Sequence, residues 1–335
     1  MQPLSITVVG AGIAGLWQAL TLARRGHRVR LFEQSSRPFA QAASSFAGAM
    51  LAPYCEAEAA EPVVRDLGLR SIALWRATYP GLVAKGTLVV AGARDRAELV
   101  RFARMTEGFS KLDAAQIDAI EPGFGTRFSA GLHYAGEAHV APSEAMAFLV
   151  GAARAAGAEV SFGVPWVSRE SAQCLRIDCR GLAAQRELPG LRGVRGERLI
   201  LRSRDVELLR PVRLLHPRHP LYVVPWADGL FMVGATVIES EDSGPITVRS
   251  ALELLASAYA LHPAFAEAEI VEASAGVRPA FPDNVPKIIV RGSTLYVNGL
   301  YRHGFLLSPA LAESVANYLE SGAVDHRTFI IESVG

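Results

Sequence analysis

A glycine-rich turn between a short apolar strand and a helix is the feature that most constrains how this chain folds. Residues 5–9 form a strand-like run that leads into Gly10, Gly12 and Gly15, and residues 13–25 have helical spacing. In this arrangement the first glycine permits a tight turn, the second lets the backbone approach a pyrophosphate, and the third allows close helix–strand packing. The first turn of the helix also presents N–H groups and a positive dipole end to phosphates. The pattern predicts a dinucleotide-binding site.

An acidic residue at the end of the next strand supports this prediction and narrows the ligand. Residues 28–32 are strand-like and end at Glu33, whose carboxylate can accept hydrogen bonds from ribose hydroxyls. A carboxylate there repels a 2′-phosphate, which disfavours NADP and leaves NAD or FAD. A chance cluster of glycines is the structural alternative, and the order of strand, helix, strand and acid argues against it.

The composition excludes several classes of protein. The chain has 335 residues, of which 50% are hydrophobic and 20% charged, with a formal net charge of +1. These values are typical of a globular protein with about two domains. The near-neutral charge gives no electrostatic reason to expect binding to nucleic acid or to an anionic membrane.

The distribution of apolar residues and cysteines indicates in which compartment of the cell the protein is expected. No segment approaches the roughly 20 apolar residues that a membrane-spanning helix needs, so no membrane insertion is expected. The first strand begins too early to leave room for a signal peptide. Cys55, Cys174 and Cys179 are too few for a disulfide framework and lack metal-type spacing. We therefore expect a cytoplasmic protein without a metal site, and its oligomeric state, including a homo-oligomer, stays open.

The order of predicted elements indicates an α/β fold with two interleaved parts. Helical spacing covers residues 13–25, 67–79, 95–107, 113–120, 143–156, 247–261 and 310–319. Strands are expected at residues 5–9, 28–32, 88–90, 132–134, 159–162, 174–179, 198–201, 212–215, 221–224, 230–233 and 295–298. We expect a Rossmann-like FAD-binding domain with a parallel sheet, built from residues 1–78, 140–198 and 276–335. A substrate-binding domain with a mostly antiparallel sheet would use residues 79–139 and 199–275.

Several segments together resemble the amino-acid and amine oxidase family of flavoproteins, the D-amino-acid oxidase type. They are residues 6–16, 45–53, 221–225 with 233–236, 275–279 with 282–283, and 297–309. The resemblance spans nearly the whole chain and is strongest to the glycine oxidases of thiamine biosynthesis. It implies FAD as the cofactor. The linkage should be non-covalent, because no cysteine after Cys179 can supply a C-terminal thioether.

The resemblance also implies which residues contact the cofactor. They are Gly10, Gly12, Ile13, Ala14, Gly15, Glu33, Ser44, Ser45, Gly48, Ala49, Met50, Val164, Cys179, Gly181, Arg278, Arg302, His303, Gly304, Phe305, Leu306 and Leu307. The small residues 42–53 let backbone lie close to a flat group, a tightly packed helix being the alternative. Residues 299–309 form a glycine-bounded turn that can donate N–H groups to a flavin carbonyl, or an ordinary strand–turn–helix joint.

Two arginines are the candidates for substrate binding. A guanidinium group forms two parallel hydrogen bonds to a carboxylate, which suits Arg278 and Arg302, with the Tyr222 hydroxyl beside them. The alternative for each arginine is a surface or interdomain ion pair. The chain departs from the family's pattern at Trp226, Leu300 and His303, which are expected around the pocket, and Arg180 either faces the pyrophosphate or is solvated.

These features predict oxidative deamination of a small amino acid or an N-substituted glycine. Hydride transfer to the flavin yields an imine that water hydrolyses, and oxygen reoxidises the flavin with release of peroxide. No residue is assigned as a catalytic acid or base. One alternative is a dehydrogenase that passes electrons to a quinone or another carrier, and a second is a non-catalytic flavin-binding protein. A flavin monooxygenase is disfavoured because the chain has no second nucleotide motif.

Overall fold

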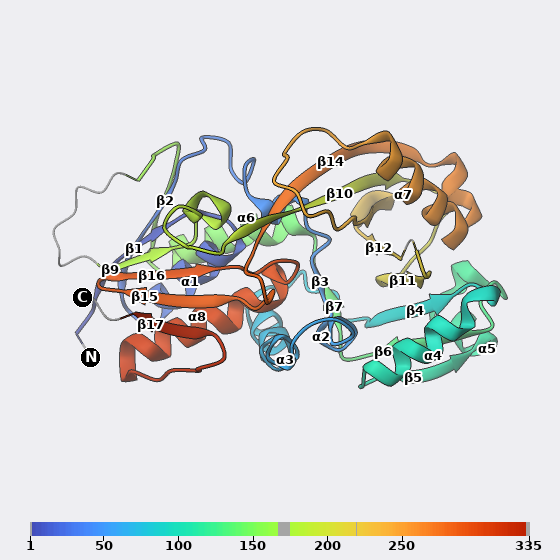
Figure 1. Ribbon diagram of the computed structural model, residues 1–335, viewed down its shortest axis with the longest axis horizontal. Helices are drawn as coiled ribbons and strands as arrows, with labels where there is room; N and C mark the ends of the chain where they lie inside the picture. The colour runs from blue at the N-terminus through green and yellow to red at the C-terminus, as the bar shows by residue number, and fades with distance from the viewer. Residues whose placement is uncertain (1, 167–174, 219, 333–335) are drawn as a thin grey trace.

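Two β-sheets dominate the computed structural model, which describes residues 2–166, 175–218 and 220–332. Figure 1 shows the two sheets at opposite ends of the long axis, each with helices packed on it. The predicted α/β class is confirmed. Cys174, which the sequence analysis placed in a strand, lies outside the described residues.

The sheet nearer the N-terminus is seven-stranded and almost entirely parallel, as predicted. Its order is β17-β15-β16-β9-β1-β2-β8, and only β15 and β16 pair antiparallel. The strands are β1 (Ser5–Val9), β2 (Arg28–Glu33), β8 (Glu159–Phe162), β9 (Leu175–Asp178), β15 (Lys287–Arg291), β16 (Thr294–Asn298) and β17 (Phe329–Glu332). Because β1 and β2 are parallel neighbours, the glycine-rich turn after β1 and Glu33 at the end of β2 lie at one edge.

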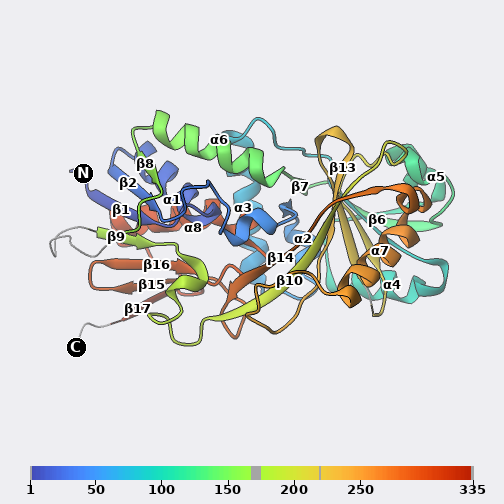
Figure 2. The ribbon, with the colours of Figure 1, turned by 90° about the horizontal axis from the view of Figure 1, so that it is seen from above.

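Four of the described helices form the main core with this sheet. They are α1 (Ile13–Arg24), α3 (Pro62–Thr78), α6 (Pro142–Ala155) and α8 (Gly304–Ser321). The apolar face of α1 buries Leu16 and Leu20 completely, and each such side chain contributes about 1.5–3 kcal/mol. Helix α1 packs against both α6 and α8, and these helices lie around it in Figure 2. This packing fixes the position of α1 relative to α6 and α8.

The second sheet is eight-stranded and mostly antiparallel, as predicted. Its order is β14-β10-β13-β12-β11-β4-β6-β5, and only β11 and β4 are parallel. The strands are β4 (Thr87–Ala91), β5 (Ser110–Asp113), β6 (Ala130–Tyr134), β10 (Arg192–Arg202), β11 (Val212–Leu215), β12 (Leu221–Pro225), β13 (Leu230–Gly234) and β14 (Glu269–Ala280). Helices α4 (Arg96–Met105), α5 (Ala114–Ile120) and α7 (Val248–Leu261) pack on it.

The long strands β10 and β14 connect the two halves of the molecule. Figure 2 shows them side by side between the sheets. The sequence analysis predicted only residues 198–201 of β10 and no strand over β14. Both strands cross the predicted domain boundaries, so the division into domains stays a prediction. Their position brings residues from both sheets to one site.

Helix α8 differs from the prediction at its start. The sequence analysis placed a helix at residues 310–319 and a turn up to Pro309, whereas α8 begins at Gly304 and contains Pro309. A proline inside a helix leaves the carbonyl four residues earlier without its usual donor. Here that carbonyl belongs to Phe305, and the indole Nε1–H of Trp75 donates to it at 2.8 Å. The tertiary contact supplies the hydrogen bond that proline removes.

Shorter elements complete the chain between these parts. The small-residue segment is not one packed helix but contains η1 (Ala43–Phe46), β3 (Met50–Leu51) and α2 (Pro53–Glu56), and β3 pairs with β7 (Ala138–His139). The other 3₁₀ helices are η2 (Ala93–Asp95), η3 (Pro122–Phe124), η4 (Gly181–Ala184), η5 (Ala227–Gly229) and η6 (Pro263–Glu267). Among the described residues, no helix combines the length and apolarity that crossing a bilayer requires.

Candidate functional site

The glycine-rich turn has the geometry that its spacing predicts. Gly10 adopts φ +97°, and a Cβ there would stand 2.8 Å from the carbonyl oxygen of Cys179. A Cβ on Gly15 would lie 1.9 Å from the carbonyl oxygen of Gly10, so no side chain fits at that position. The turn, β9 and the first turn of α1 are therefore packed backbone to backbone. This close packing leaves the N-terminal end of α1 open toward a cavity.

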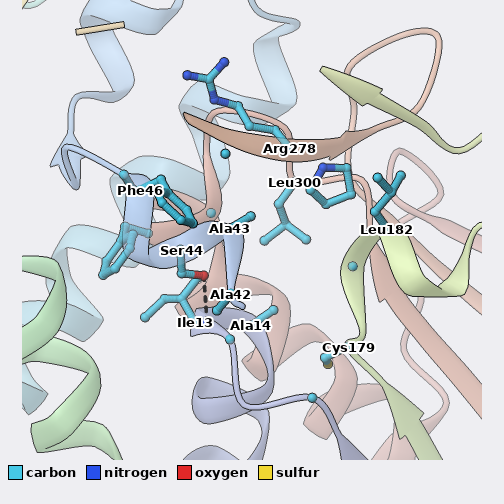
Figure 3. Close-up of a pocket in the computed structure, with 18 of the residues that line it drawn as sticks. Ile13, Ala14, Ala42, Ala43, Ser44, Phe46, Cys179, Leu182, Arg278 and Leu300 are labelled. Atoms are coloured by element: carbon cyan, nitrogen blue, oxygen red, sulfur yellow. Dashed lines mark hydrogen bonds between the residues drawn. The ribbon is translucent and has the colours of Figure 1, made fainter. Parts of the chain in front are cut away.

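Two side chains bind backbone N–H groups at this turn. Oε2 of Glu33 accepts from Ala11 N–H at 2.9 Å, while its Oε1 accepts from Ser35 N–H at 2.9 Å. The Ser44 hydroxyl accepts from Ile13 N–H at 3.0 Å, as Figure 3 shows. Ser44 thus caps α1 from another segment of the chain, because Gly12 has no side chain to do so.

A cavity of about 430 Å³ runs from this turn to β14. Most of the predicted cofactor-contacting residues line it, namely Gly10, Gly12, Ile13, Ala14, Glu33, Ser44, Gly48, Ala49, Met50, Cys179, Gly181, Arg278, Arg302, His303, Gly304, Phe305 and Leu306. Tyr222 lines it as well. Figure 3 shows Ser44 and Ile13 at one end and Arg278 on the strand across from them. The structure therefore brings nearly all of the predicted residues together.

Four predicted cofactor contacts are not among the lining residues. Gly15 and the fully buried Leu307 lie in the packing behind the cavity. The Ser45 hydroxyl donates to the carbonyl oxygen of Phe39 at 2.7 Å. Val164 is 42% exposed and its N–H donates to Glu33 O, while the next residues, Pro165 and Trp166, line the cavity instead.

Some of the residues that depart from the family's pattern line the cavity, and one does not. Leu300 and His303 line the cavity, as expected. Trp226 is not among the lining residues and packs beside Val224 and Met232 in a small apolar cluster, because its strand-end position turns it toward β13. Arg180 lines the cavity and is ion-paired with the buried Asp178 at 2.7 Å and with Glu187 at 2.8 Å.

Arg278 is a half-buried cation that the described part of the chain leaves without a carboxylate partner. Its Nη1 donates to the carbonyl oxygen of Thr236 at 3.2 Å, and no acidic side chain of the described residues forms an ion pair with it. Burial lowers the pKa of this guanidinium. A guanidinium is never deprotonated at ordinary pH, so the group stays charged and requires an anion.

Arg302 belongs to a looser group of charges that also line the cavity. The Glu56 carboxylate lies 4.0 Å from Arg302 Nη2, 3.4 Å from Arg213 Nη1 and 3.6 Å from His303 Nδ1. Burial alone raises the pKa of Glu56, but the positive charges of Arg302 and Arg213 outweigh it and hold that pKa at about 2. Burial lowers the pKa of His303 to about 4, so His303 is neutral at neutral pH.

The sequence analysis missed three residues of this end of the cavity, Glu56, Arg213 and Gly196. Arg213 lies opposite Tyr222 in the β11–β12 ladder, so the two side chains share one face of the sheet. Glu56 ends the single turn α2, immediately after the small-residue segment. The one sequence signal for these three residues was the position of Arg213 beside a predicted strand residue. Nothing in the local sequence pattern distinguished Glu56 or Gly196 from other residues of their kind.

The described cysteines and histidines lie in separate places. Within residues 2–166, 175–218 and 220–332, no cluster of His, Cys, Asp and Glu has the arrangement to bind a metal ion. Cys55 and Cys179 are free and buried. His139 is buried with its Nε2 at 3.1 Å from the carbonyl oxygen of Pro225, which is a structural role.

The cavity fits a flavin dinucleotide on its own chemistry. Gly12, Ala42 and Ala43 keep the wall beside α1 free of large side chains, and Glu33 stands where a ribose is expected. On the opposite side a Cβ at Gly48 would lie 3.0 Å from the Tyr222 ring, so this wall also leaves little room for a side chain at position 48. The groups that would hold the cofactor therefore converge on one continuous space.

Comparisons of the sequence agree with this geometry. The chain matches the DAO family, described as FAD dependent oxidoreductase, over residues 5–318. A Rhizobium etli protein named as a thiamine biosynthesis oxidoreductase, ThiO, is 51% identical over 97% of this chain and 99% of its own length. The glycine oxidase of Geobacillus kaustophilus is 28% identical, covering 94% of this chain and 92% of its own.

Solved structures show the same fold. The crystal structure of the Geobacillus kaustophilus glycine oxidase superposes with a TM-score of 0.82 over 100% of both chains at 24% identity. An iminodiacetate oxidase from Chelativorans has a TM-score of 0.78 over 98% of this chain and 100% of its own, at 22% identity. With the family match over nearly the whole chain, these findings show that the protein belongs to the DAO family of FAD dependent oxidoreductases.

Proposed function

We propose that the protein oxidises glycine or an N-substituted glycine with FAD, in the manner of a glycine oxidase. The observation that carries the proposal is Arg278, a half-buried guanidinium that lines the cavity and has no carboxylate partner among the described residues. An unpaired charge that is partly desolvated is unfavourable, and the carboxylate of an amino acid would compensate it. The names of the relatives support glycine as the leading candidate.

The residues around Arg278 have complementary roles in this proposal. Tyr222 places its side chain beside the same space and adds a hydroxyl to the carboxylate site. Arg302 keeps the site positive, and its charge is partly balanced by Glu56. Bound FAD supplies a two-electron acceptor, and the protein contributes orientation of the substrate Cα–H bond toward it.

Five further parts of the assignment are proposals of the same kind. Oxygen is the proposed acceptor, and the FAD is taken as non-covalent. The residues that carry the first sheet form the proposed FAD-binding domain, and those that carry most of the second sheet form the substrate-binding domain. The buried free thiols of Cys55 and Cys179 fit the reducing cytoplasm. A role in thiamine biosynthesis follows from the name of the Rhizobium relative.

The decisive experiment mixes the purified yellow protein anaerobically with single amines and amino acids. Glycine or sarcosine should bleach the flavin absorption, and simple amines without a carboxylate should not. Under air, release of peroxide supports oxygen as the acceptor, whereas dye reduction without peroxide supports a dehydrogenase. Absence of bleaching with every compound would contradict the proposal and favour a non-catalytic flavin-binding protein.

A further inference from the structure

We propose that Glu56 is a catalytic residue that accepts a hydrogen bond from the substrate amino group and stabilises the positive charge that develops on its nitrogen. The inference rests on the proposed oxidation of an amino acid and assigns that same site a group for the amine. It differs from the sequence analysis, which assigned residues only to the carboxylate of the substrate.

The Glu56 carboxylate has unused hydrogen-bonding capacity. Its side chain is 19% exposed and lines the cavity. Within the described chain, its one hydrogen bond comes from Arg213 Nη1 at 3.4 Å, far from the about 2.7–2.9 Å of a charge-assisted bond. The His303 and Arg302 contacts are longer still. Because the Glu56 carboxylate is largely enclosed and its hydrogen bond is long, it can accept a further hydrogen bond from an N–H donor.

Arg278 and Glu56 form a complementary pair across the cavity. Arg278 is a donor without a carboxylate, and Glu56 is a carboxylate without a close donor. An amino acid carries both missing groups, a carboxylate and an amino N–H, on one carbon atom. Neither a simple carboxylic acid nor a simple amine satisfies both side chains, so the pair selects for amino acids.

The charge of Glu56 decides what it does during the reaction. The carboxylate is ionised at neutral pH because Arg302 and Arg213 hold its pKa at about 2, and it therefore keeps no proton taken from the substrate. The substrate reacts as the neutral amine, after its ammonium proton has passed to solvent. When the Cα–H bond breaks, its electron pair leaves with the hydrogen as hydride to the bound flavin, and the nitrogen lone pair forms the C=N bond. The nitrogen becomes an iminium cation, which a fixed anion stabilises more than the neutral amine.

The backbone around Glu56 holds the carboxylate in place before substrate binds. The buried carboxylate Oε1 of Glu137 accepts from Cys55 N–H at 2.8 Å, and Glu56 N–H donates to Ala52 O at 3.0 Å. Pro53 fixes the first position of α2. Such pre-organisation is what makes a charged group effective in catalysis.

The test compares Glu56→Gln with Glu107→Gln. The Glu107 carboxylate is ion-paired with Arg65 at 2.6 Å and is not among the lining residues. Two quantities are measured on FAD-loaded protein: the dissociation constant of acetate, from the flavin spectrum, and the rate of anaerobic flavin reduction by sarcosine. Acetate reports the carboxylate site alone, and sarcosine reports the amine site as well.

Glu56→Gln should slow reduction by sarcosine about 10²–10³-fold, the loss typical of removing one group that stabilises transition-state charge. Acetate should bind as tightly as in the wild type, or more tightly. Glu107→Gln should behave as the wild type in both measurements. An unchanged reduction rate in Glu56→Gln overturns the proposal, and so does an equal weakening of acetate and sarcosine, which would mean that Glu56 only positions Arg302.

A second variant keeps the test decisive if Glu56→Gln loses its flavin. Glu56→Asp keeps the charge and withdraws it by one methylene, and its reduction rate should fall below that of the wild type. A wild-type rate in Glu56→Asp together with wild-type acetate binding would overturn the proposal. If no amine bleaches the wild-type flavin, the proposed function itself has failed, which is a separate outcome.

Discussion

The guanidinium group of Arg278 occupies the space that a side chain at position 196 would fill. A Cβ built on Gly196 would lie 1.9 Å from Arg278 Nη2 and 2.2 Å from Cζ. The two residues belong to paired strands, because Val194 of β10 lies opposite Arg278 of β14. Gly196 therefore lets the guanidinium lie against the backbone, where it is desolvated and faces the cavity.

Gly196→Ala should displace this guanidinium and weaken substrate binding. We expect kcat/KM to fall about 10–100-fold, mainly through KM, because a small misplacement of a binding group has effects of this size. Steady-state kinetics with glycine or sarcosine measure the change. Gly151→Ala on α6, where a Cβ meets no atom within 4 Å, is the matched control and should leave kcat/KM unchanged. An unaltered KM in Gly196→Ala would contradict this account of Arg278.

Arg278→Ala and Arg278→Lys should lose turnover while they retain FAD. Removing one partner of a buried charge pair costs about 2–5 kcal/mol, so kcat/KM for amino acids should fall steeply. Lysine keeps the charge but cannot form two parallel hydrogen bonds to a carboxylate, so Arg278→Lys should retain only part of the wild-type kcat/KM. Flavin content and kinetics are measured on the same preparation. Wild-type kinetics in Arg278→Ala would remove Arg278 from the substrate site.

Glu33→Gln should weaken FAD binding without changing the fold. The Glu33 carboxylate holds Ala11 N–H and Ser35 N–H, and a neutral amide keeps only one acceptor oxygen. We expect an increase in the dissociation constant of FAD of about 10–150-fold, which corresponds to the loss of one hydrogen bond to a charged group. Titration of the apoprotein with FAD gives this value. Glu320→Gln, at a surface ion pair with Arg25, is the control and should bind FAD as the wild type does.

Glu137 should make stability fall as the pH rises. Burial raises the pKa of Glu137 from 4.5 to about 7, so the folded state retains a proton that the unfolded chain has lost. The contribution of Glu137 to the free energy of unfolding is fully present below pH 4.5. This contribution should decline by about 3 kcal/mol as the pH rises from 4.5 through 7. Glu137→Gln keeps an acceptor for Cys55 N–H and should lose less stability between pH 5 and pH 8. Urea unfolding at both pH values tests this, and an identical decline in both proteins would contradict it.

The elements that short sequence patterns specify agree with the structure. The turn at Gly10, the helix α1 and the acid Glu33 depend on residues that are close along the chain, and all three were predicted. The parallel sheet and the largely antiparallel sheet were also predicted, because alternation and helix periodicity are local signals. The start of α8 was predicted wrongly, since Trp75 satisfies the carbonyl that Pro309 leaves without a donor.

The substrate end of the cavity was decided by tertiary structure. Glu56, Arg213 and Arg302 belong to α2, β11 and the turn before α8, and only the folding of the chain brings them within 4.0 Å. Gly196 is one glycine among many until β10 pairs with β14 and its missing side chain admits Arg278. The sequence by itself determined the glycine-rich turn and the acid of the proposed dinucleotide site, because these residues are close along the chain. The charges around the proposed substrate site come from distant segments, and no local sequence pattern shows which of them lie together in the fold.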